Sequence, residues 1–215
     1  MAATVRDSEC MTALACAGAQ RPPMPGPAVR DAAQSRRADR RAAMTRRFVV
    51  REGGRHDLSA MADNLAAGFA SYRTWAHPGW EPPSRAEMLL GMMQRFTNDG
   101  TWYFVGFEDN TPAGHVTARP ELDEREAPLP GVTRLTHLFL RREHWGSGLA
   151  DILHDTMRES MRERGFDSAC LWTPAGAARA RRFYVRHGWR PTGARDPEND
   201  LGLELMEYAL ELPAA

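Results

Sequence analysis

The segment from residue 132 to residue 173 constrains the fold more than any other part of the sequence. Residues 132–140 are strand-like, residues 148–164 have the periodicity of an amphipathic helix, and residues 169–173 are typical of another strand. A strand, a helix and a strand in this order form a parallel pair joined by a right-handed crossover. The sequence therefore predicts a sheet with at least one parallel pair of strands.

The flanking sequence adds further strands and helices to this unit. Residues 101–108 and 112–118 are strand-like and flank the turn signal Asp109–Asn110, which predicts an antiparallel hairpin. Further strands are expected at residues 48–51 and 203–212, helices at 57–72, from 84 onward and at 177–187, and a loop at 119–131. This order predicts an α/β protein with a central mixed, mostly antiparallel sheet between helices on both faces.

Two of the expected helices have recognisable starts. Asp57 is a plausible N-cap of the first helix, because its carboxylate can accept a hydrogen bond from the first turn. Ser84 with Glu87 three residues later forms a capping-box pattern for the second.

Residues 1–43 are predicted to be a disordered extension that precedes one domain at 44–215. Residues 21–27 are rich in proline, and residues 31–41 combine small residues with arginines and carry little apolar surface. A signal peptide is not favoured, because acidic residues precede a short apolar piece at 11–19. Met44 is a plausible alternative translation start.

Composition excludes several classes of function. All 28 basic residues are arginine, so a lysine Schiff base, a lysine nucleophile and a Walker A phosphate site are excluded. The formal net charge is zero, which does not favour a nucleic-acid partner. No apolar run approaches the roughly 18 residues of a membrane span. We therefore expect a cytoplasmic protein that binds neither membrane nor nucleic acid.

Cysteine and histidine usage predicts no disulfide framework and no bound metal. The cysteines are Cys10, Cys16 and Cys170, an odd and sparse set. Cys170 lies in an apolar run, which favours a small core residue over a reactive thiol. The seven histidines show no HExxH spacing, and there is no CxxC motif.

A glycine-bearing turn joins the strand that ends at Leu140 to the amphipathic helix. Gly146 and Gly148 carry no side chain, so a ligand oxygen can approach the unpaired amides of the first helical turn. Such a turn suits an anion, and a pyrophosphate in particular, although a merely tight connection is the alternative. The turn is not a GxGxxG motif, since Asp151 occupies the last glycine position.

Two motifs in register resemble the GCN5-related N-acetyltransferase (GNAT) superfamily. The run from Trp145 to Ala150 resembles its Gln/Arg-x-x-Gly-x-Gly/Ala signature, with Trp145 in place of Gln or Arg. The run from Phe183 to Trp189 resembles its Phe-Tyr-x-x-x-Gly-Phe block. The resemblance covers residues 48–212 and implies a three-layer fold whose sheet splays between strands four and five. It also implies acetyl-CoA as the co-substrate.

The resemblance implies a role for individual residues. Backbone groups at the end of the fourth strand would pair with the pantetheine arm and the thioester, at Leu138, Phe139 and Leu140. The backbone of the glycine turn would hold the pyrophosphate, at Trp145, Gly146, Ser147, Gly148, Leu149 and Ala150. Thr173 ends the neighbouring strand, and Ala177 lies where many relatives carry an asparagine that contacts the pantetheine.

Tyr184 matches the family tyrosine that often protonates the leaving thiolate. A phenol with a pKa near 10 suits this role, because the thiolate has a roughly similar basicity. The alternative is an amphipathic core tyrosine beside Phe183.

The general base is left unassigned. Strict alternation puts Leu135, His137 and Phe139 on one face of their strand, and a β-bulge would change this. His137 is either a base or a hydrogen-bonded structural histidine. Glu143 and His144 are expected to be solvated side chains near the coenzyme loop.

The amine acceptor is predicted only as a class, a small molecule or a peptide. The aromatic stretch 72–83 is either a wall of the acceptor pocket or a packed loop. The acidic residues of 121–126 either attract a cationic amine or belong to a solvated loop.

The expected activity is acetyl transfer from acetyl-CoA to an amine. A non-catalytic acyl-CoA-binding regulatory domain is the alternative, which Ala177 keeps open. Nucleic-acid binding by the arginine clusters at 36–41 and 179–182 is disfavoured, because the clusters are far apart in the sequence and the total charge is neutral. The oligomeric state is left open, a homodimer included.

Overall fold

The computed structural model describes residues 47–213 apart from 99, 198 and 200. The predicted extension at 1–43, which includes Cys10, Cys16 and the arginine cluster at 36–41, lies outside the described residues and stays a prediction. Met44 lies outside them as well. No described helix is long and apolar enough to cross a membrane.

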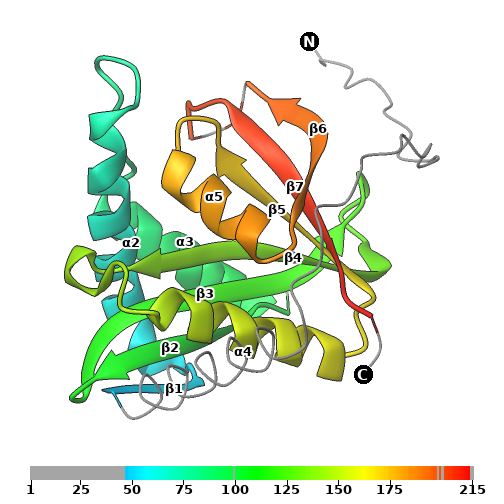
Figure 1. Ribbon diagram of the computed structural model, residues 1–215, viewed down its shortest axis with the longest axis horizontal. Coiled ribbons are helices and arrows are strands. Elements are labelled where there is room, and N and C mark those ends of the chain that lie inside the picture. The colour runs from blue at the N-terminus through cyan, green and yellow to red at the C-terminus, as the bar shows by residue number, and fades with distance from the viewer. Residues whose placement is uncertain (1–46, 99, 198, 200, 214–215) are drawn as a thin grey trace, which may run out of the picture. The chain divides into compact units, whose positions relative to one another are not determined.

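A mixed sheet of seven strands forms the middle layer (Figure 1). Its order is β1-β2-β3-β4-β5-β7-β6, and only the β4–β5 pair is parallel. The strands are β1 (Phe48–Glu52), β2 (Trp102–Glu108), β3 (Thr111–Leu122), β4 (Pro128–Leu140), β5 (Ser168–Pro174), β6 (Arg190–Asp196) and β7 (Leu205–Glu211). The parallel pair is the one predicted from the strand–helix–strand unit at 132–173.

Helices cover both faces of the sheet, as predicted. Helices α2 (Leu58–Ala70) and α3 (Arg85–Asn98) lie on one face, and α4 (Leu149–Glu163) and α5 (Ala178–Arg186) lie on the other (Figure 1). Short 3₁₀ turns precede or follow them, namely η1 (Arg55–Asp57), η2 (Ser71–Thr74) and η3 (Arg142–His144). The three-layer α/β architecture is therefore confirmed.

Each face of the sheet has its own hydrophobic core. On the α4 face, the apolar stripe of α4 packs against β2, β3 and β4, with Leu149, Leu153 and Met157 at 0% exposure. On the opposite face, Met61 and Leu65 of α2 pack with Met92 of α3 and Val105 of β2. Burial of apolar surface on both faces stabilises the sheet between the helices.

The capping predictions had different outcomes. The Ser84–Glu87 capping box is confirmed, because the Glu87 amide donates to Ser84 Oγ (3.2 Å) and the Ser84 amide donates to Glu87 Oε2 (2.7 Å). Asp57 precedes α2, but its side chain does not cap that helix. Its carboxylate accepts hydrogen bonds from the Gly54 amide and from the Arg51 guanidinium instead, because η1 brings these donors closer.

The prediction of a loop at 119–131 is wrong, because these residues form the end of a long β3–β4 hairpin. Strand β3 continues to Leu122 and β4 starts at Pro128. Asp123 Oδ1 closes the turn by accepting hydrogen bonds from two amides of the tip. The prolines and acidic residues of this segment indicated a loop. Hairpin ends at a sheet margin nevertheless tolerate proline, so the strands were not predicted.

Strand β6 was also missed. It pairs only with β7 and is exposed along most of its length. An edge strand needs no apolar face and accepts Pro191 and Gly193, so its sequence carries no strand pattern.

An irregularity in the β3–β4 ladder determines which side chains of β4 share a face. Thr117 pairs with His137, whereas the next residue, Ala118, pairs with Leu135, so Thr136 is an extra residue. Leu135 consequently packs in the α4-side core, while Phe139 packs on the α2 side. The strict alternation is therefore wrong, and the bulge that was its alternative is present.

Helix α2 approaches β4 closely through Gly68. A Cβ atom on Gly68 would lie 2.1 Å from the Phe139 ring, whereas a Cβ on Gly91 in α3 would meet nothing within 4 Å. The absence of a side chain at Gly68 therefore lets the two elements pack.

We expect Gly68→Ala to lower the free energy of unfolding by about 1–3 kcal/mol, because the methyl group overpacks the contact with Phe139. Gly91→Ala is the matched control, and it should raise the free energy of unfolding by up to about 1 kcal/mol through helix propensity. Urea denaturation of the two variants measures both changes, and equal effects would contradict the close packing.

Candidate active site

A gap opens between β4 and β5 where their pairing ends. The parallel ladder contains three pairs, from Val132–Ser168 to Arg134–Cys170. Beyond it, β4 continues to Leu140 on the edge of β3, and β5 continues to Pro174 on the edge of β7. Leu138, Phe139 and Leu140 therefore present one backbone edge toward the gap, and Thr173 lies on the opposite strand.

The glycine turn lies between this strand end and the start of α4. Gly146 and Gly148 have φ angles of 79° and 92°, which non-glycine residues rarely adopt. Among the described residues, the amides of Gly146, Gly148 and Ala150 donate to no backbone carbonyl. With the positive end of the α4 dipole beside them, these amides have the arrangement that suits an anion.

The other amides of the turn are already paired. The Ser147 amide donates to the His144 carbonyl (3.2 Å), and the Leu149 amide donates to Ser147 Oγ (3.3 Å). The Trp145 amide donates to the Arg142 carbonyl (3.1 Å). The structure thus divides the amides of the six predicted residues into three available donors and three internal ones.

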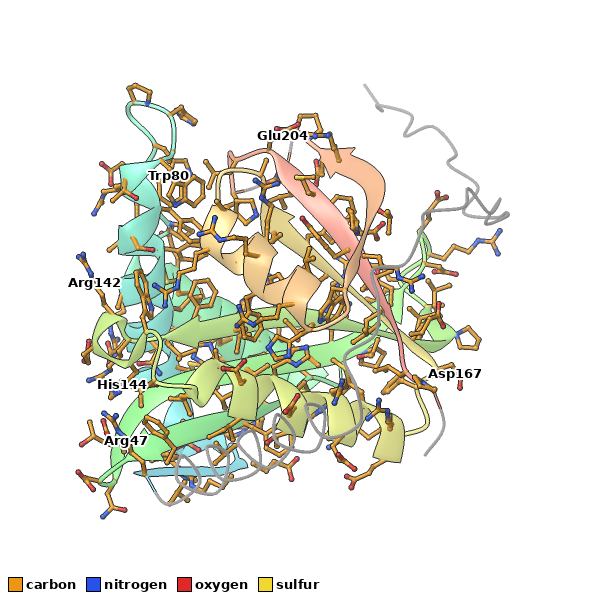
Figure 2. All side chains as sticks on the ribbon, viewed as in Figure 1. Arg47, Trp80, Arg142, His144, Asp167 and Glu204 are labelled. Carbon is orange, nitrogen blue, oxygen red and sulfur yellow. The ribbon has the colours of Figure 1, made fainter. Side chains whose placement is uncertain are left out.

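Trp145 has two arginines against its ring, which sequence reasoning missed. The guanidinium of Arg179 in α5 lies 4.6 Å from the ring centroid, and that of Arg142 lies 6.0 Å away. Neither arginine forms an ion pair with a described residue. The two arginines thus bring positive charge to the turn at the position where the GNAT signature has Gln or Arg. Arg142 is labelled in Figure 2.

The opposite side of the gap is formed by β5 and α5. Thr173 and Ala177 are both buried, and the Ala177 amide donates to the Pro174 carbonyl (2.9 Å). Tyr184 of α5 is 7% exposed, and its ring lies 6.4 Å from that of Tyr208. Burial, and secondarily the nearby Tyr72 hydroxyl, raises the pKa of Tyr184, so its phenol keeps its proton at neutral pH. The same shift makes it a weaker acid than the phenol with a pKa near 10 that was expected from the sequence.

An aromatic cluster faces the end of β4. The Tyr72 ring lies 4.6 Å from that of Trp75, 6.0 Å from that of Trp80 and 6.4 Å from that of Phe139. Trp80, labelled in Figure 2, donates through Nε1 to the Leu201 carbonyl (2.8 Å). The aromatic stretch is therefore packed, as one alternative predicted, and it also adjoins the predicted thioester strand.

The candidate general bases lie in different places in the structure. His144 is buried rather than solvated, and its Nδ1 lies 3.3 Å from Glu108 Oε2, while Glu143 is exposed. Burial, and then the charge of Arg95, lowers the pKa of His137 to about 4. His137 is consequently neutral at physiological pH and a weak base.

The acidic residues of the hairpin do not form one cationic-ligand site. The Glu121 carboxylate pairs with Arg134, and Cys170 Sγ lies 3.4 Å from it. Glu124 and Glu126 are exposed at the hairpin tip. Burial and Glu121 raise the pKa of the Cys170 thiol to about 12, which agrees with a small core residue rather than a nucleophile.

One group of described residues has metal-like proximity. Ligand atoms of His154, Asp155 and His187 lie within 4.8 Å of one another. However, the indole N–H of Trp189 donates to His154 Nε2 (2.9 Å), which requires the ring proton to reside on Nδ1. That nitrogen is then a donor and not a metal ligand, so the chemistry of the group does not fit a metal site.

Comparisons with known proteins agree with this geometry. The model of the acetyltransferase (GNAT) family matches residues 65–189. A search of curated protein sequences finds no match.

Solved structures of low sequence identity share the fold. The PaiA N-acetyltransferase of Thermoplasma acidophilum, in complex with coenzyme A, has a TM-score of 0.57 and 16% identity over 74% of this chain and 97% of its own. YncA of Salmonella typhimurium, a putative acetyltransferase with acetyl-CoA, has a TM-score of 0.60 and 16% identity over 78% and 95%. The ribosomal-protein-alanine N-acetyltransferase of Brucella melitensis has a TM-score of 0.59 and 18% identity over 76% and 99%.

The family model covers more than half of the chain and includes both the glycine turn and the Tyr184 helix. The strand gap beside a glycine turn with free amides is the arrangement that the sequence resemblance implied. The chain belongs to the GNAT family of N-acetyltransferases.

Proposed function

We propose that the protein transfers the acetyl group of acetyl-CoA to the amine of a small molecule or peptide by direct attack. The observation that carries this proposal is the gap between β4 and β5 beside the open amides of the glycine turn. The gap suits an extended chain that pairs with a strand edge, and the turn suits a pyrophosphate. Coenzyme A joins these two features in one molecule.

The pyrophosphate would bind the free amides of Gly146, Gly148 and Ala150. Arg142 and Arg179 support this proposal, because their guanidinium groups lie against Trp145 and bring positive charge to the turn. Their presence compensates for the Gln or Arg that Trp145 replaces.

The pantetheine arm would lie along the open edge of β4 at Leu138, Phe139 and Leu140. Amide and carbonyl groups of this edge are the hydrogen-bonding partners that an extended amide chain needs. Thr173 and Ala177 would line the other side, and Ala177 has no side-chain amide to offer the pantetheine.

The reaction would proceed through one tetrahedral intermediate. The amine lone pair forms a C–N bond with the thioester carbonyl carbon, and the carbonyl oxygen becomes an oxyanion that a backbone N–H of β4 can stabilise. The C–S bond then breaks, and its electron pair leaves with sulfur. Tyr184 donates its phenolic proton to the thiolate and is reprotonated by solvent.

The proton of the attacking amine would leave to water. His137 has a pKa of about 4, which makes it a poor acceptor for an ammonium proton. A cytoplasmic location and a possible assembly into a homodimer accompany this proposal as predictions.

The direct test is release of free thiol from acetyl-CoA in the presence of a panel of amines and peptides. Amine-dependent thiol release supports the transferase. Tight binding of acetyl-CoA by calorimetry without release for any amine would support the non-catalytic acyl-CoA-binding domain instead.

Gly146→Ala should weaken coenzyme A binding by about tenfold or more, because the new Cβ projects into the open space in front of the turn. The control is Gly193→Ala in β6, where φ is 94° and a Cβ also meets nothing within 4 Å. Both variants carry similar backbone strain, of about 1–2 kcal/mol. Calorimetry with coenzyme A distinguishes them, and equal affinities would argue against the phosphate role of the turn.

Tyr184→Phe should lower kcat by about 10²–10⁴-fold and leave the affinity for acetyl-CoA nearly unchanged. Because the pKa of Tyr184 is raised, the phenol stays protonated through the ordinary tyrosine range, so wild-type kcat should not fall between pH 7 and about 10 from loss of this proton. Steady-state kinetics measures both effects. Unchanged turnover in the variant would remove the acid role, and circular dichroism controls for folding.

A further inference from the structure

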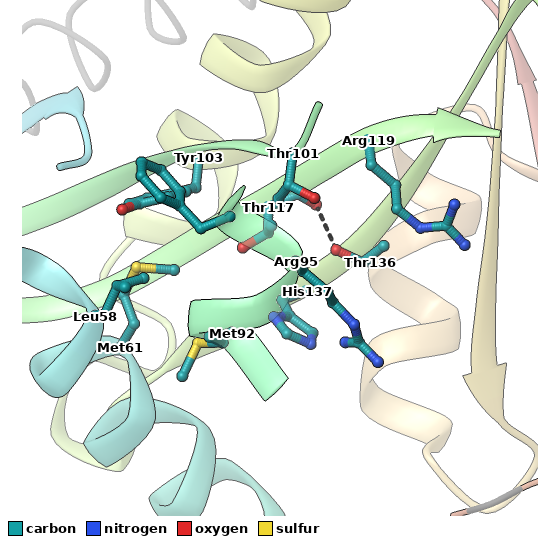
Figure 3. A pocket seen from close by; sticks show the side chains of 11 residues that line it. Leu58, Met61, Met92, Arg95, Thr101, Tyr103, Thr117, Arg119, Thr136 and His137 are labelled. Atoms are coloured by element: carbon teal, nitrogen blue, oxygen red, sulfur yellow. Dashed lines mark hydrogen bonds between the residues drawn. The ribbon is translucent and has the colours of Figure 1, made fainter. Parts of the chain in front are cut away.

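A pocket lies between the helices α2 and α3 and the strands β2–β4, beside the bulge in β4 (Figure 3). The pocket is partly open to solvent. One part of its wall is apolar and comes from Leu58, Met61, Met92 and Phe96. A largely apolar wall with a few polar groups is typical of a small-molecule site.

Two polar atoms at the bulge make no hydrogen bond with the described residues. They are Thr117 Oγ1 and His137 Nδ1, and both side chains line the pocket. Thr117 is only 5% exposed. Buried polar atoms normally have partners, so these two point to a polar ligand.

The pocket carries unbalanced positive charge. Arg95 of α3 and Arg119 of β3 lie on the same side of it, opposite Leu58 and Met61 (Figure 3). Neither guanidinium forms an ion pair with a described carboxylate, and no acidic side chain is among the lining residues. Arg119 Nη1 donates only to the neighbouring Pro120 carbonyl (3.2 Å). The charge therefore favours an anionic ligand over a cationic one.

The pocket adjoins the proposed reaction centre. His137 lines the pocket, and the next residue along β4 is Leu138, whose backbone edge faces the gap. Consecutive Cα atoms are about 3.8 Å apart, so an acceptor whose amine reaches the thioester can place its other end in the pocket.

We propose that the acceptor is a small amine that also carries a carboxylate, held by Arg95 and Arg119, with its apolar part against Met61 and Met92. Arginine binds carboxylates through paired N–H donors, which gives orientation as well as affinity. This proposal rests on the acetyl transfer proposed above, and it names the class of substrate for the same site.

Two matched series of acceptors test the proposal. One series is phenylalanine, phenylalaninamide and phenethylamine, and the other is ε-aminocaproate, its amide and hexylamine. The values of kcat/KM are expressed per unprotonated amine, because the amines of a series differ in pKa. In at least one series, the carboxylate member should be preferred over its amide by about ten- to a hundredfold.

Arg119→Gln and Arg95→Gln should each reduce this preference by about tenfold or more. They should leave the KM for acetyl-CoA and the reaction of the simple amine within about twofold. The control is Arg125→Gln, at the exposed tip of the β3–β4 hairpin, which should retain the full preference.

Two outcomes would overturn this proposal and leave the acetyl transfer intact. One is transfer to amines without a preference for carboxylates, and the other is a carboxylate preference that persists in both arginine variants. If no amine of either series reacts, calorimetry on the coenzyme A-loaded protein decides. Binding of N-acetylphenylalanine in preference to N-acetylphenylalaninamide supports the proposal, and equal or absent binding overturns it. Failure to bind coenzyme A itself would overturn the proposed function.

Discussion

The end of backbone pairing between β4 and β5 is the constraint on which the site depends. Three residue pairs hold the two strands together, and after Arg134 and Cys170 each strand continues with a different neighbour. A strand edge that is open inside a protein needs hydrogen-bonding partners. A ligand with amide groups can supply them, which is why the gap and the glycine turn together suit coenzyme A.

The bulge at Thr136 has a second consequence. Because of the bulge, three side chains pack in the α4-side core, namely Leu135, Leu138 and Leu140. His137 and Phe139 lie on the face that carries α2 and α3. One strand can therefore close the core on one face, present its backbone edge to the proposed co-substrate and line the proposed acceptor pocket on the other face. In a regular strand, Leu135 and His137 would share one face of the sheet, and the side chains of β4 would be distributed differently between the two faces.

Much of the fold could be predicted because its elements carry strong local patterns. The amphipathic helix at 149–163, its terminal glycines and the apolar strands around it satisfy periodicity and capping rules on their own. Strand β6 and the ends of the β3–β4 hairpin could not be predicted, because exposed edge strands have no apolar face to reveal them. The arginines at 95, 119, 142 and 179 were missed as site residues for a different reason, since each comes from a separate element.

The sequence by itself determined the parallel unit, the glycine turn before α4 and the family, because these depend on residues close together along the chain. Only the tertiary structure decided where β4 leaves β5, which amides of the turn remain free, and that Arg142 and Arg179 lie against Trp145. It also decided that Arg95 and Arg119 share a pocket with His137. Strand register and long-range packing set these relations, and neither is encoded in a local pattern.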